Sequence, residues 1–169
     1  MLVFAGWLFF RALIALRPED AQRILPSSQT HTNLEWIGLI VAILALIVLY
    51  IILHEAIHGV CFWTFTRTRP KFAFRLTYAS ASAPDWFIPR NLYLITELAP
   101  LAVLTLAGLA LFSIAPAAWL APIWLVSTIN AGGAAGDLVV AGWLLFQPHT
   151  CLAQDCGDAV TLFKPGDEK

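Results

Sequence analysis

The sequence predicts an all-α polytopic membrane protein with three to four transmembrane helices and one small β-hairpin between the first long helix and the next span. Composition is the first observation behind this fold class. Hydrophobic residues make up 59% of the 169 residues and charged residues 12%, whereas soluble domains are about 45–50% apolar and about 25% charged. The second is a mean hydropathy of +0.75. The third is that apolar runs long enough to cross a bilayer recur along the chain.

Charge and cysteine content exclude two other classes of protein. The formal net charge is −1 and no basic stripe is present, so we expect no nucleic-acid partner. The three cysteines are too few for a disulfide framework. The first residues lack a basic leading region and a small-residue cleavage site, so we expect them to belong to the mature protein.

The chain divides into three predicted regions. Residues 1–33 combine an apolar segment, residues 1–16, with a polar connection. That segment is interrupted by Arg11 and is short for a span of about 20 residues, so it either crosses as a fourth helix or lies in the interface. Residues 34–148 form the membrane-embedded core, and residues 149–169 form a polar cytoplasmic tail with a short strand-like segment.

Within the core we predict three helices and one strand pair. The first helix covers residues 34–65. Residues 71–79 alternate between apolar and polar side chains, with Phe72, Phe74, Leu76 and Tyr78 on one side, which predicts the first arm of a hairpin. The second helix covers residues 91–112, with a kink at Pro100, and the last covers residues 122–146.

The distribution of basic residues predicts the orientation. The loop after the first long helix carries one acid, Asp85, against five bases: Arg67, Arg69, Lys71, Arg75 and Arg90. By the positive-inside rule this loop is cytoplasmic. We therefore expect an integral protein of a prokaryotic plasma membrane, with its functional site opening toward the cytoplasm.

The sequence His54-Glu55-Ala56-Ile57-His58 stands near the end of the first long apolar run. Ionisable groups at membrane depth are costly and usually mark a functional site. Two histidines four residues apart project from one face of a helix, so both can bind one metal ion. Glu55 points about a quarter-turn away, where it can act as a general base on water.

A catalytic zinc ion needs a third protein ligand. Asp137 lies ten residues before Gln147 and His58 lies nine before Arg67, so both lie at similar depth from the cytoplasmic side, and Asp137 is the preferred ligand. Glu97, early in the middle span, is the alternative ligand. The thiol of Cys61, three residues after His58, is a weaker candidate.

Asn130 lies seven residues before Asp137, on the same helix face. It is a candidate for binding a substrate carbonyl or the developing oxyanion, or simply for bonding a neighbouring helix. Two functions remain open at this point. The first is a zinc-dependent peptidase that cuts a peptide or membrane-protein substrate in or beside the bilayer, and the alternative is a non-catalytic metal-binding membrane protein.

From residue 34 onward the chain resembles the putative zincin membrane peptidase family. The resemblance is carried by HEAIHG at the end of a long apolar helix, the small β segment, the late NAGGAAGD and the ending QDCGDAVTLFKP. That family looks related to the site-2 intramembrane metalloproteases, although here Gly136 precedes the acid and in those proteases the glycine follows it. The resemblance implies Zn²⁺ on His54, His58 and Asp137, with Glu55 as general base.

Overall fold

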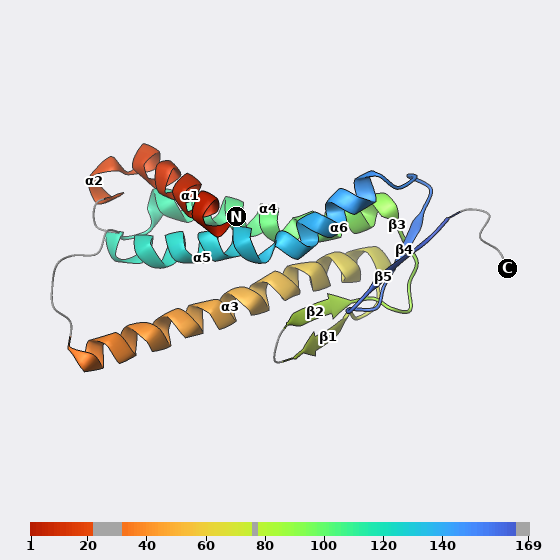
Figure 1. Cartoon of the computed structure of the whole chain (residues 1–169), viewed down its shortest axis with the longest axis horizontal. Helices are drawn as coiled ribbons and strands as arrows, with labels where there is room; N and C mark the ends of the chain where they lie inside the picture. The colour runs from red at the N-terminus through yellow and green to blue at the C-terminus, as the bar shows by residue number, and fades with distance from the viewer. Residues whose placement is uncertain (22–31, 76–77, 165–169) are drawn as a thin grey trace. The chain divides into compact units, whose positions relative to one another are not determined.

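The computed structural model describes residues 1–21, 32–75 and 78–164. Figure 1 shows a mostly helical chain with two small antiparallel sheets. The helices are α1 (Leu2–Leu16), α2 (Pro18–Ala21), α3 (Asn33–Thr66), α4 (Arg90–Ile114), the 3₁₀ turn η2 (Ala117–Trp119), α5 (Leu120–Gly133) and α6 (Ala135–Leu145). The strands are β1 (Lys71–Phe74), β2 (Ala79–Ser82), β3 (Ile88–Pro89), β4 (Leu152–Asp155) and β5 (Val160–Phe163).

The chain forms two compact units. The helical unit comprises Met1–Tyr50 and Val103–Gly133, and the strand-containing unit comprises Ile51–Ala102 and Ala134–Lys169. In the helical unit α1 packs along α5. One buried hydrophobic cluster of this unit consists of Phe9, Leu13, Ala21, Phe112 and Leu120. The indole N–H of Trp124 donates to the Gly6 carbonyl over 2.9 Å, so a polar contact joins α5 to α1.

The strand-containing unit has its own core, to which both sheets and three helices contribute. Its buried members are Phe62, Ala81, Ala83, Ile88, Tyr93, Leu144 and Ala153. Strand β1 pairs with β2 so that Phe72 lies opposite Ala81. Strand β4 lies between β3 and β5 in the second sheet. The end of α3, the start of α4 and α6 pack around one cavity of this unit.

Local interactions and backbone conformation explain where α3 begins and ends. The Thr32 backbone N–H donates to Glu35 Oε2 over 2.6 Å, and the Glu35 N–H lies 3.4 Å from Thr32 Oγ1. This reciprocal arrangement is a capping box, which satisfies N–H groups at a helix start. At the other end Arg67 has φ 58°, the left-handed conformation that commonly follows a helix.

Two of the described helices, α3 and α4, are long and apolar enough to cross a membrane, and α5 with α6 make a third if the broken pair counts as one span. Only 6% of the apolar window of α3 is buried within the protein, so its outer surface suits lipid. Helix α1 has 15 residues, fewer than the roughly 17–25 of a spanning helix. By length and composition, the described residues 1–21, 32–75 and 78–164 therefore contain two candidate spans, or three if the broken pair is one span.

Three expectations need correction. Residues 71–79 are not one strand, because β1 ends at Phe74 and β2 begins at Ala79; Leu76 lies outside the described residues. The last predicted span is broken at Ala134 into α5 and α6. The chain also contains a second sheet, β3-β4-β5, to which the predicted tail contributes two strands.

Arg90 ties the start of α4 to the end of α6. Its Nε donates to the Leu144 carbonyl over 2.7 Å and its Nη2 to the Leu145 carbonyl over 3.0 Å. The last carbonyls of a helix have no intrahelical donors, and a cation there also opposes the negative end of the helix dipole. Arg90 therefore fixes α6 against α4.

We expect Arg90→Ala to lower the free energy of unfolding by about 2 kcal/mol, since a hydrogen bond to a charged group contributes about 1.5–3 kcal/mol. Denaturant unfolding in detergent micelles measures this. Arg69→Ala is the control, because Arg69 is exposed and a surface change is usually within about 0.5 kcal/mol. Equal stability of the two variants would contradict a role of Arg90 in holding α6.

Candidate metal centre

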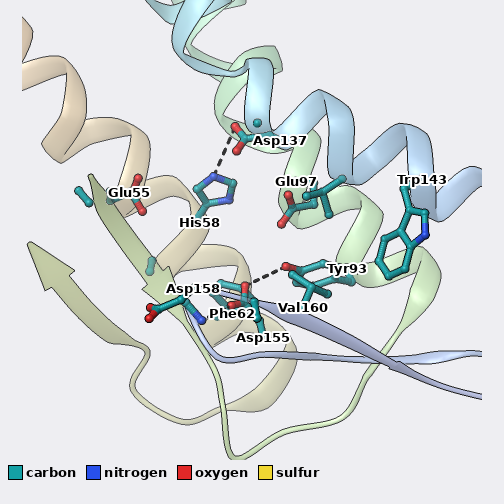
Figure 2. A pocket seen from close by; sticks show the side chains of 16 residues that line it. Glu55, His58, Phe62, Tyr93, Glu97, Asp137, Trp143, Asp155, Asp158 and Val160 are labelled. Carbon is teal, nitrogen blue, oxygen red and sulfur yellow. Dashed lines mark hydrogen bonds and ion pairs between the residues drawn. The ribbon is translucent and has the colours of Figure 1, made fainter. Parts of the chain in front are cut away.

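His54, Glu55 and His58 project from the second half of α3 and are all buried, at 6%, 9% and 7% exposure. Figure 2 shows Glu55 and His58 beside a cavity of about 400 Å³ in the strand-containing unit. The helical spacing of four residues places the two imidazole rings 5.0 Å apart between centroids. Both rings can therefore reach one ion.

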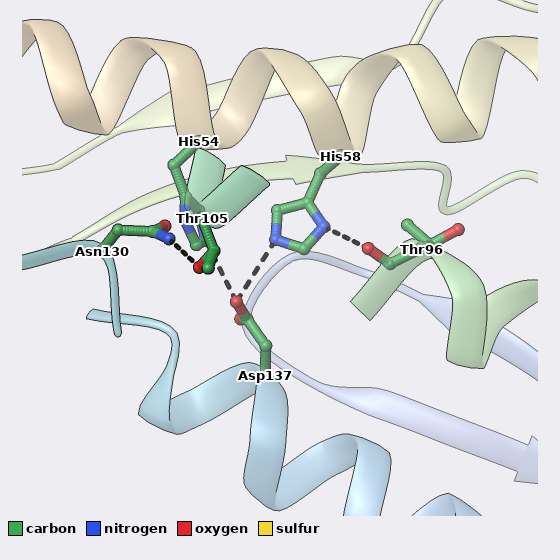
Figure 3. Close-up of polar contacts among 6 residues, drawn as sticks. All are labelled: His54, His58, Thr96, Thr105, Asn130 and Asp137. Atoms are coloured by element: carbon green, nitrogen blue, oxygen red, sulfur yellow. Dashed lines mark hydrogen bonds and ion pairs between the residues drawn. The ribbon is translucent and has the colours of Figure 1, made fainter. Parts of the chain in front are cut away.

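Asp137 faces the two histidines from the first turn of α6 (Figure 3). Its Oδ2 lies 3.1 Å from His54 Nε2 and 3.7 Å from His58 Nε2. The break at Ala134 creates a helix start immediately before the aspartate, and helix starts favour negative charge. One ligand atom from each of these residues lies within 4.8 Å of the others.

His58 is oriented by a backbone carbonyl. Its Nδ1 lies 3.0 Å from the Thr96 oxygen, and a carbonyl can only accept, so Nδ1 carries the proton. A neutral His58 then presents the lone pair of Nε2 toward Asp137. Bonds of this kind, from the outer ring nitrogen to a carbonyl, are typical of metal-binding histidines.

The three residues fit a metal ion. His58 Nε2 and a carboxylate oxygen of Asp137 face each other favourably when a metal ion or a proton lies between them. Asp137 Oδ2 is buried, and its close polar neighbours among the described residues are the Nε2 atoms of the two histidines. The observed 3.1 and 3.7 Å separations bracket the ~3.3 Å between ligands in a tetrahedron with bonds of about 2.0–2.1 Å. This group could hold a metal ion.

Glu55 lies on the cavity side of α3 and outside the group of three ligands. It lies at the cavity wall that β2 forms with Ala79 and Ala81. A carboxylate so placed can accept a proton from water in the cavity.

The far wall of the cavity is built by α4 and the second sheet. The Tyr93 hydroxyl donates to Asp155 Oδ2 over 2.9 Å, and the Gly157 N–H donates to Asp155 Oδ1 over 2.7 Å. Gly157 has φ +88°, a conformation that favours glycine. Burial raises the pKa of Asp155, although these two hydrogen bonds act in the opposite direction. Asp155 therefore links the turn after β4 to α4.

The structure separates the alternative site residues from the ligand group. Glu97 is buried and lines the same cavity, but it is not a member of the group. Cys61 is half-buried and is not a member either. Asn130 belongs to the helical unit, where its Nδ2 donates to Thr105 Oγ1 over 3.5 Å. Its role toward an oxyanion stays a prediction.

Three participants were missed by sequence reasoning: the Thr96 carbonyl, the Tyr93 hydroxyl and Asp155. The sequence does not mark a backbone carbonyl directly. Pro100, four residues after Thr96, could have indicated that this carbonyl lacks its helical donor. The sequence Asp155-Cys156-Gly157 was another, because aspartate two residues before glycine is typical of a turn closed by the carboxylate.

Comparison with known proteins places this site in a family. The family model described as "Putative zincin peptidase" matches residues 46–152, which include HEAIH and Asp137. A zincin is a zinc-dependent peptidase, so membership implies zinc. No curated protein and no solved structure matches the chain. Because the family model covers more than half of the 169 residues, the chain belongs to this family of zincin peptidases.

Proposed function

We propose that this protein is a zinc-dependent peptidase of the HExxH type, related to the site-2 proteases, that hydrolyses peptide bonds within or beside a membrane. One observation carries the proposal: the Asp137 carboxylate lies between two helical histidines, and Glu55 from the same helix turn reaches the adjoining cavity. A metal-binding protein without catalysis would need the three ligands but not Glu55.

The ligands are His54, His58 and Asp137. A zinc ion bound to them would lower the pKa of water toward about 7 and polarise the scissile carbonyl. Glu55 accepts the proton of the attacking water and delivers it to the leaving amine. His54, Glu55 and His58 are buried, which limits the access of bulk water to the reacting groups.

Strand β2 is the proposed docking edge for the substrate. Helical substrate has its carbonyls bonded internally, so it must be extended before cleavage. Strand β2 pairs with β1 on one side, while Ala79 and Ala81 face the cavity. An extended peptide added along that side would bond through its backbone and lie beside Glu55.

The bilayer and a peptide or membrane protein are the proposed partners. The apolar, mostly unburied surface of α3 supports a lipid environment. The five bases around the hairpin support a cytoplasmic opening of the site. The carboxylates around the cavity, Glu97, Asp155 and Asp158 in addition to the site residues, favour a cation in it.

Cleavage by the purified, zinc-loaded full chain in detergent or liposomes tests the function. The substrates are unstructured peptides and single transmembrane helices, each carrying a fluorophore and quencher. We expect cleavage that is abolished by a zinc chelator and restored by stoichiometric zinc, because the ion activates water. Product masses identify the cut bond. Tight zinc binding without cleavage of any peptide would favour the non-catalytic alternative.

A further inference from the structure

Helix α4 carries Pro100 in its interior, and this residue is fully buried. In an uninterrupted α-helix the N–H of residue 100 would donate to the carbonyl of residue 96. Proline has no N–H, and its ring also crowds the carbonyl four residues earlier. The Thr96 carbonyl therefore loses its regular helical donor.

That carbonyl accepts from His58 instead. His58 Nδ1 lies 3.0 Å from the Thr96 oxygen. Thr96 is completely buried and His58 is 7% exposed, so little water reaches this oxygen. A carbonyl without a donor is unfavourable in a membrane interior, and neighbouring helices commonly supply the missing donor. Here the donor is a metal-site histidine.

We propose that Pro100 is a positioning residue of the metal centre. By removing the helical donor it keeps the Thr96 carbonyl available to His58 Nδ1–H. This bond holds the proton on Nδ1 and directs the Nε2 lone pair toward Asp137 and the ion. The proposal rests on the zinc ligands of the proposed function but does not depend on peptide hydrolysis.

A purely structural role for Pro100 makes a different prediction. A proline that only shapes or packs α4 would change stability when replaced, but it would leave the proton of the neutral His58 ring where it is. The Thr96 hydroxyl donates to the Leu92 carbonyl over 3.1 Å and so remains part of its own helix. The tautomer of His58 therefore distinguishes the two roles.

The variants Pro100→Ala and Pro100→Gly regain an N–H at position 100, which competes for the Thr96 carbonyl. We expect zinc binding to weaken about 10–100-fold, as for the loss of other bonds that orient metal ligands. Competition with a chromogenic chelator measures the affinity, and circular dichroism checks the helix content. Pro122→Ala is the matched control, because Pro122 is a helical proline of the other unit.

Nitrogen chemical shifts of ¹⁵N-histidine protein, metal-free and at alkaline pH, report the tautomer, with the His58 signals assigned by His58→Ala. We expect Nδ1–H in the wild type and in Pro122→Ala, and a larger share of Nε2–H in both Pro100 variants. Unchanged zinc affinity in folded Pro100 variants would overturn the proposal. The Nε2–H tautomer in the wild type would also overturn it, and this measurement does not depend on any variant folding. A wild type that binds no zinc would instead refute the metal site.

Discussion

Replacing Glu55 by glutamine is expected to lower the rate of peptide hydrolysis by about 10²–10⁴-fold while leaving zinc bound, because general acid–base catalysis contributes about that factor. Glutamine has nearly the shape of glutamate but cannot accept the proton of water. The three ligand atoms come from other residues, so the ion loses no ligand. The measurements are initial cleavage rates and the zinc content of the same preparation.

Glu35→Gln is the matched control for this change. Glu35 lies on the same helix, in its first turn, and glutamine also serves in a capping box, so activity and stability should both be retained. Cleavage at the wild-type rate by Glu55→Gln would remove Glu55 as the base. The protein would then need another proton acceptor in the cavity, or would not be a peptidase of this type.

Removal of Asp137 is expected to have the largest effect on the metal. We expect Asp137→Ala to bind zinc at least ~100-fold more weakly, more than the loss of an orienting bond costs. The reason is that two imidazoles on one helix leave a catalytic zinc site one protein ligand short. Zinc titration of the purified variant in micelles measures the affinity, and cleavage should be lost with it.

Two cavity carboxylates provide controls for Asp137. Asp158→Ala and Glu97→Gln each remove a carboxyl group from the same cavity without removing a member of the ligand group, so zinc should remain bound in both. If Asp137→Ala kept full zinc occupancy while Glu97→Gln lost it, the third ligand would be Glu97. This comparison separates direct ligation from the general effect of an acidic cavity.

The ligand group could be assembled from the sequence because each step used a regular element. Helical spacing paired His54 with His58, and counting residues from the predicted cytoplasmic side of two predicted spans placed Asp137 at similar depth. The structure brings these three together, and the family resemblance is confirmed. The break at Ala134 did not affect this count, because Asp137 lies on the short helix α6, between the break and Gln147, from which the residues were counted.

The second sheet could not be predicted in the same way. Strand β3 has two residues, Ile88 and Pro89, too few for an alternating pattern, and its pairing with β4 joins segments more than 60 residues apart. The bond between His58 and Thr96 depends on how α3 and α4 pack, which local pattern does not specify. The cause of this bond is Pro100, four residues after Thr96, and from the sequence this proline was interpreted only as a kink in the helix.

Strand β4 also determines when the cavity can close during biosynthesis. Asp155, in the far wall, follows Glu55 by 100 residues, and ribosomes add about 5–20 residues per second. The base and both histidines therefore precede the last part of the wall by roughly 5–20 s. Because Asp137 follows His58 by 79 residues, the nascent chain cannot assemble the group of three ligands when the first long helix has just been made. The proposed peptidase activity can begin only after Asp155 has been added.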